Sequence, residues 1–176
     1  MAATRALPGI RMTVRRLMTW LLYALLVLVA AVLVAGQAGW FAGKTPTDLG
    51  VVNGRLKPPS RTENSVSSQA GLYPDHPMKA YAEIAPIKFT GEGRAAIERI
   101  KRIVESTPGA RVIRAELTYL YAQCQTRWLK FVDDVEFFVD ESAKVVHVRS
   151  ASRIGRGDLG VNRARIEAIR KRFAGE

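Results

Sequence analysis

A long apolar segment near the N-terminus constrains this 176-residue chain more than any other feature. No charged residue lies between Met18 and Lys44, and an apolar helix of about 20 residues spans the roughly 30 Å hydrocarbon core of a bilayer. Aromatic residues, which favour the membrane interface, stand near its two ends: Trp20, Tyr23 and Trp40. We therefore predict a transmembrane signal-anchor over residues 19–40.

The charges that flank this segment predict its orientation. Arginines and no acidic residue precede it, whereas one lysine and then an aspartate follow it. The positive-inside rule places the basic tail of residues 1–18 in the cytoplasm and the rest of the chain across the membrane. A single-pass protein of a bacterial inner membrane, with a periplasmic domain, fits this pattern best. A cleaved signal peptide is the alternative, since Gly36-Gln37-Ala38 offers a small-x-small site, although signal peptides carry a shorter apolar core.

Composition and charge narrow the classes of partner. The chain has 27 Lys+Arg against 16 Asp+Glu, a formal charge of +11, which favours an anionic small molecule, polysaccharide or lipid headgroup. Nucleic acid is not expected as a partner, because the predicted orientation places the domain outside the cytoplasm and the sequence has no basic strand interleaved with aromatic residues. The single Cys124 excludes an internal disulfide and a multi-cysteine metal site. No cofactor motif is present, so we expect neither cofactor nor metal.

The remaining chain divides into a linker and a folded domain. Residues 41–70 are rich in Gly, Pro, Ser, Thr and Asn and show no helical or strand period, which indicates a flexible linker. Residues 71–176 carry the periodic patterns of a soluble domain. Apolar spacings of three and four predict one helix after Gly93 and another from near Gly160 to Phe173. Alternating segments between them predict strands, so we expect an α+β fold with two helices on one face of an antiparallel sheet.

Two of the predicted strands form a hairpin around residues 140–143. Pairing Val139 with Lys144 places Phe137 opposite Val146 and Asp134 opposite Arg149, so apolar side chains meet on one face and opposite charges on the other. The same pairing puts Glu136 opposite His147, on the exposed face, and Asp133 opposite Ser150. Asp133 breaks the pattern, because the alternation points this carboxylate towards the core. It is either a polar anchor for the loop after residue 152 or a carboxylate with a perturbed pKa at a site.

The most suggestive stretch runs from the last strand through three glycines into the last helix. A glycine-rich loop entering a helix leaves amide donors facing outward, where an anion is favoured, and neighbouring arginines grip carboxylates or phosphates. The alternative is a structural turn whose arginines pair with Asp133, Asp134 and Glu136. For the first reading, the expected ligand-binding residues are Arg149, Ser150, Ser152, Arg153, Arg156, Asp158, Asn162 and Arg163.

Four blocks of the domain carry a family resemblance. They read NSVSS at 64–68, FVDDVE at 131–136, VRSASRIG at 148–155 and DLGVNRAR at 158–165. Together they resemble the signature of the DUF1499 family, small bacterial and plastid proteins whose function is not assigned. The resemblance covers about residues 60–173 and implies no reaction.

These observations give two hypotheses of different classes. The first is a non-enzymatic, membrane-anchored envelope protein that binds an anionic ligand or partner through the arginine-glycine turn. The second is a hydrolase in which Asp133 or Asp134 acts as general base while arginines hold an anionic substrate. Against the enzyme, the sequence shows no nucleophile–His–acid set.

Overall fold

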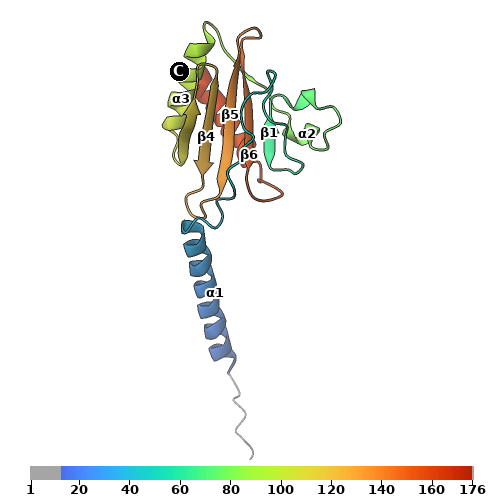
Figure 1. The fold of residues 1–176 in the computed structure, drawn as a ribbon. Helices are drawn as coiled ribbons and strands as arrows, with labels where there is room; N and C mark the ends of the chain where they lie inside the picture. The colour runs from blue at the N-terminus through green and yellow to red at the C-terminus, as the bar shows by residue number, and fades with distance from the viewer. Residues whose placement is uncertain (1–12, 176) are drawn as a thin grey trace, which may run out of the picture.

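The computed structural model describes residues 13–175, in which one long helix stands below a domain of helices and strands (Figure 1). The helix, α1 (Val14–Gln37), is long and apolar enough to cross a membrane. It begins and ends a few residues before the predicted segment of residues 19–40. Its side chains are exposed, apart from Gly36 and a few partly covered neighbours at its C-terminal end.

The domain is built on a six-stranded antiparallel sheet. In chain order the strands are β1 (Ser65–Ser67), β2 (Ile87–Lys88), β3 (Ala110–Ala115), β4 (Tyr119–Gln125), β5 (Val132–Asp140) and β6 (Val145–Ser152). They lie in the order β1-β6-β5-β4-β3, and β2 also pairs with β6. Two short helical turns, η1 (Ala70–Leu72) and α2 (Lys79–Ala82), precede β2.

Two longer helices cover one face of the sheet, α3 (Gly93–Glu105) and α4 (Val161–Gly175). Their apolar stripes, with Ile100 and Ile166 fully buried, pack against inward side chains of β4, β5 and β6 such as Phe137 and Val148. Removing this apolar surface from water is the main stabilising term of such a layer. The expected α+β class, with an antiparallel sheet and helices on one face, is confirmed.

The β5–β6 hairpin is shifted by two residues from the predicted register. Asp140 pairs with Val145 and Glu136 pairs with Arg149, which leaves a four-residue loop of residues 141–144. The loop closes because the Asp140 carboxylate accepts hydrogen bonds from the backbone N–H groups of Ser142 and Ala143, both at 3.0 Å. Lys144 completes it with a positive φ of 52°. A shift of two preserves which face each side chain occupies, so the apolar alternation was kept while the partners changed.

The second face of the sheet is also covered, which corrects the expected linker of residues 41–70. Leu56 is fully buried against Tyr119 and Tyr121, with Leu49 and Val51 packed beside it. Further along, residues 65–67 form β1 beside β6. The folded domain therefore begins well before residue 71. The polar face of the sheet lies under this segment, so Glu136 and Arg149 are buried rather than solvated.

His147 was expected on an exposed face of the sheet, but it is half-buried. Its burial predicts how the stability of the domain depends on pH. Burial lowers its pKa below the ordinary 6.5, and the nearby Asp140 carboxylate only partly offsets this. The unfolded chain therefore binds the proton more readily, and the free energy of unfolding should be highest above pH 6.5 and fall as the pH drops through the lowered pKa. Urea unfolding at pH 7.5 and 5.5 checks this. His147→Gln should show a smaller loss between the two pH values than wild type, and an equal loss would contradict the assignment.

Candidate functional site

The arginine-glycine turn after β6 is occupied by the chain's own carboxylate. One oxygen of Asp158 accepts hydrogen bonds from the backbone N–H of Gly160 (3.0 Å) and the hydroxyl of Tyr81 (2.6 Å), and the other accepts from the backbone N–H of Asn162 (3.0 Å). Burial raises the pKa of the Asp158 carboxyl, but these hydrogen bonds outweigh burial and hold it below its usual value. The amides at the start of α4 therefore already have an acceptor within the chain.

Three acidic residues of β5 are buried, and each meets one arginine. The pairs are Asp133 with Arg165 of α4, Asp134 with Arg153 after β6, and Glu136 with Arg149 of β6. We call them the three acid–arginine pairs. Their acidic side chains are at most 8 % exposed, so each carboxylate depends on its cation and its hydrogen bonds.

The Asp134–Arg153 pair has the most complete geometry. The guanidinium donates through Nε and Nη2 to the two carboxylate oxygens at 2.9 and 2.7 Å. The Tyr121 hydroxyl donates to the same carboxylate at 2.6 Å. The hydrogen bond to Asp134 raises the pKa of Arg153, so this cation stays charged. On the same face the Glu136 carboxylate accepts from the Tyr119 hydroxyl at 2.8 Å and from the backbone N–H of Gly50 at 2.9 Å.

The third pair belongs to a polar cluster on the opposite face. Arg165 reaches Asp133 and also donates to the side-chain oxygen of Asn162 at 2.7 Å. The buried Asn162 accepts from Ser150 at 2.6 Å and donates to Ser152 at 3.0 Å. This cluster joins the end of β6 to the start of α4, so it holds the turn in place.

The structure thus distributes the sequence-predicted site residues over several places. Ser150, Ser152, Asp158 and Asn162 lie together in the polar cluster, and Arg149 and Arg153 lie in pairs on the other face. Arg163 donates to the backbone carbonyls of Tyr81 and Glu83 at 2.5 and 2.9 Å and so ties α4 to α2. Arg156 is exposed, and within residues 13–175 it makes no hydrogen bond or ion pair. The two general-base candidates, Asp133 and Asp134, both accept hydrogen bonds from arginine.

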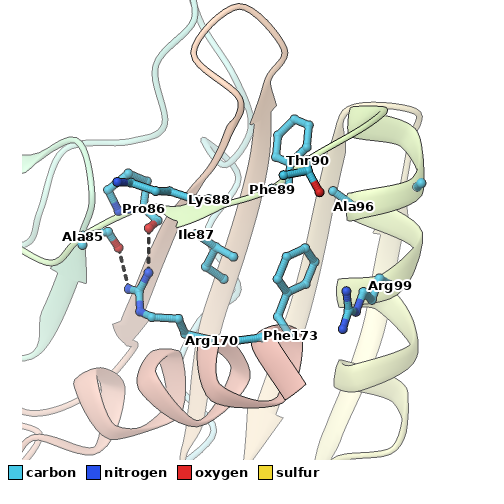
Figure 2. A pocket seen from close by; sticks show the side chains of 12 residues that line it. Ala85, Pro86, Ile87, Lys88, Phe89, Thr90, Ala96, Arg99, Arg170 and Phe173 are labelled. Atoms are coloured by element: carbon cyan, nitrogen blue, oxygen red, sulfur yellow. Dashed lines mark hydrogen bonds between the residues drawn. The ribbon is translucent and has the colours of Figure 1, made fainter. Parts of the chain in front are cut away.

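A different feature has the shape of a ligand site. A cavity of about 620 Å³ lies between β2, the N-terminal half of α3 and the C-terminal end of α4 (Figure 2). Its walls are mostly apolar, with Ile87 and Phe89 from the β2 region, Ala96 from α3 and Phe173 from α4. We call it the α3–α4 cavity. Small-molecule sites fall in this size range and share this mainly apolar lining.

Three cationic side chains belong to the lining of the α3–α4 cavity. Arg99 places its guanidinium 4.7 Å from the centre of the Phe173 ring. Arg170 donates to the backbone carbonyls of Ala85 and Pro86, both at 2.6 Å, as Figure 2 shows. Lys88 is exposed at the edge of the cavity. Arg170 also donates to Glu167 at 3.0 Å, which leaves Lys88 as the exposed cation of the lining. An apolar cavity with a lysine at its edge is complementary to a molecule with an apolar body and an anionic head.

Comparison with known proteins assigns the family. The sequence pattern of DUF1499, described as a protein of unknown function, matches residues 55–173. The chain belongs to the DUF1499 family. The match begins at residue 55, which agrees with the structure in placing the start of the DUF1499 domain before β1. Neither the comparison with curated proteins nor that with solved structures found a match.

Sequence reasoning missed Arg165 and the whole α3–α4 cavity. Arg165 follows Asn162 by three residues and precedes the buried Ile166, so helical spacing places it beside the buried face of α4. That spacing could have identified it as a partner for Asp133. The cavity had no such signal, because its walls come from three segments that are distant in the sequence.

Proposed function

We propose that this DUF1499 protein is a membrane-anchored binding protein that holds an anionic amphiphile in the α3–α4 cavity. The observation that carries the proposal is the combination of an apolar cavity of about 620 Å³ with the exposed Lys88 in its lining. The apolar tail would lie against Ile87, Phe89 and Phe173. The anionic head would lie near Lys88, because Arg170 already donates to two backbone carbonyls and to Glu167. The bilayer that holds α1 is a source of molecules of this chemistry, and they would leave it to reach the cavity, which lies beside the hairpin turn of residues 141–144.

The anchoring part of the proposal is supported by the way α1 meets the domain. Gln37, the last residue of α1, donates from its side chain to the backbone carbonyl of Trp128 at 2.8 Å. Gly36 packs so closely on Leu129 that an added Cβ would lie 2.8 Å from its Cα. A cleaved segment would forfeit these contacts, which favours an uncleaved anchor. The flanking charges favour a cytoplasmic N-terminus and a periplasmic domain.

The proposal locates the anion near the cavity rather than at the arginine-glycine turn. Arg149 and Arg153 are committed to buried carboxylates and Arg163 to backbone carbonyls. The hydrolase alternative gains no support from Asp134, since both of its oxygens accept hydrogen bonds from Arg153. No cofactor is required by a binding function of this kind.

Photoaffinity labelling tests the proposed function. The probe is an alkyl phosphate with a diazirine in its tail, added to the full chain in nanodiscs of neutral lipid. We expect labelled peptides from residues 85–99 and 170–174, in addition to peptides of α1, which lies in the bilayer itself. Labelling of α1 serves as the internal standard, because probe dissolved in the bilayer reaches it without the cavity.

Matched variants separate the cavity from the bilayer. Ala95→Trp fills the cavity from an exposed position of α3 and should remove most labelling of residues 85–99 and 170–174, whereas Ala168→Trp, exposed on α4 outside the cavity, should not. Lys88→Gln should weaken labelling by the phosphate but not by the corresponding alcohol, with the exposed Lys171→Gln as its control. Labelling confined to α1 in the wild type would refute the proposed function.

A further inference from the structure

The junction between α1 and the domain is short and packed. Beyond the contacts of Gly36 and Gln37, the ring of Phe41 stacks on Phe131 with centroids 5.4 Å apart. Gly43, with a φ of +68°, lies so close to Arg153 that an added Cβ would be 2.7 Å from its Cβ. This end of the domain is therefore held next to the C-terminal end of α1 (Figure 1).

Two loops meet at this same end. The first, residues 126–131, connects β4 to β5, and the second, residues 153–160, connects β6 to α4. They are neighbours because Asp133 pairs with Ser152 where β5 begins and β6 ends. Both loops also line one cavity of about 270 Å³. We call these two loops the membrane-facing end.

Large apolar side chains are exposed on the membrane-facing end. Trp128 is 62 % exposed and Leu159 is fully exposed, at 102 %. Leu159 also has a φ of 52°, a conformation that side chains larger than glycine or asparagine rarely adopt. The turn itself is held by the hydrogen bonds that Asp158 accepts from the backbone N–H groups of Gly160 and Val161, both at 3.0 Å. It leaves the leucine side chain outside the hydrophobic core, where an apolar environment outside the chain would cover it.

The charges of the membrane-facing end are positive. Arg127 lies over the Trp128 ring at 4.9 Å, Lys130 follows Arg127 by three residues, and Arg156 is exposed on the second loop. The one acid of the two loops, Asp158, is engaged by Tyr81 and the start of α4. Exposed tryptophan and leucine among arginine and lysine are the composition of surfaces that lie on anionic membranes.

We propose that the membrane-facing end lies on anionic phospholipid headgroups, with Trp128 and Leu159 inserted between them and Arg127, Lys130 and Arg156 paired with phosphates. This inference rests on the anchoring part of the proposed function and is independent of the α3–α4 cavity. It fixes the domain on the bilayer at the end of its anchor, so that the hairpin turn of residues 141–144 points away from the membrane. Each basic residue near an anionic surface should strengthen the contact about fivefold.

Fluorescence quenching by brominated lipids tests this surface. Trp20→Phe and Trp40→Phe leave Trp128 as the single tryptophan of the full chain. In brominated nanodiscs containing phosphatidylglycerol we expect strong quenching of Trp128, and in purely zwitterionic nanodiscs a smaller quenched fraction. The charge-removing pair Arg127→Gln and Arg156→Gln should reduce the ratio of quenched to unquenched protein in the anionic nanodiscs about 25-fold.

Two further variants control for the fold and for distance. Leu159→Asn removes the apolar side chain while keeping a residue that accepts a positive φ, so it should lower quenching without lowering the melting temperature. A tryptophan introduced by Ser142→Trp in a Trp128→Phe background should remain unquenched at the distal turn. Absent quenching of Trp128, or equal quenching in anionic and zwitterionic nanodiscs, would overturn the inference. Failure of α1 to enter nanodiscs at all would instead refute the anchor.

Discussion

Arg153→Ala should lower the free energy of unfolding by about 3–5 kcal/mol, because it leaves a buried carboxylate without its cation. The Asp134 side chain is 2 % exposed and loses two charge-assisted hydrogen bonds, at 2.9 and 2.7 Å. Only the Tyr121 hydroxyl then remains as a close donor. In thermal unfolding of the full chain in neutral nanodiscs, a loss of this size corresponds to roughly 10 °C or more.

Arg156→Ala is the matched control for this result. It removes an arginine from the same turn, but Arg156 is exposed and makes no hydrogen bond or ion pair in the described chain, so the change should stay within about 0.5 kcal/mol. Replacing both members of the buried pair, as Asp134→Leu with Arg153→Met, should recover much of the loss, because no uncompensated charge remains. Equal melting temperatures for Arg153→Ala and Arg156→Ala would show that the pair is not structural.

Asn162→Ala should be the second severe change, with a loss of at least about 3 kcal/mol. The fully buried side chain accepts from Ser150 and Arg165 and donates to Ser152, to Asp158 and to the backbone carbonyl of Asn64. Its removal leaves several buried polar groups short of a partner at once. Because Asn64 directly precedes β1, the damage should reach that edge strand.

Amide hydrogen exchange locates this damage. In Asn162→Ala we expect faster exchange in β1 and the first turn of α4, with a smaller change in the central strand β4. Glu167→Ala, on the exposed face of α4, is the control and should alter neither stability nor exchange by more than about 0.5 kcal/mol. Uniformly unchanged exchange in β1 would mean that Asn162 does not join the helix to the sheet.

The parts of the fold with strong periodicity were predictable. The spacing of Ile97, Ile100 and Ile103 predicted α3, and the uncharged run between Met18 and Lys44 predicted a helix long enough to cross a membrane. The register of the β5–β6 hairpin was harder to predict from the sequence, since a shift of two residues leaves the apolar alternation intact. The loop chemistry of Asp140 and Lys144 and the pairing of Glu136 with Arg149 favour the observed register.

The covered second face of the sheet could not be predicted from local pattern. Leu56 is an isolated apolar residue in a polar, proline-containing stretch, and nothing nearby in the sequence marks it as a core residue. Its burial depends on Tyr119 and Tyr121, which are more than sixty residues away. Once that face is covered, Asp134 and Glu136 become buried, and their pairing with Arg153 and Arg149 follows from the cost of an isolated buried charge. The sequence had left open whether these arginines were structural.

Contact between an amphiphile and the α3–α4 cavity tests the proposed binding function most directly. Intermolecular nuclear Overhauser effects would be measured between dodecyl phosphate and labelled methyl groups of the full chain in deuterated nanodiscs. Contacts from the alkyl chain to the methyl groups of Ile87 and Ala96, lost in Ala95→Trp, are the predicted result. Contacts confined to the methyl groups of α1 and of the membrane-facing end would contradict the claim that the cavity is a binding site.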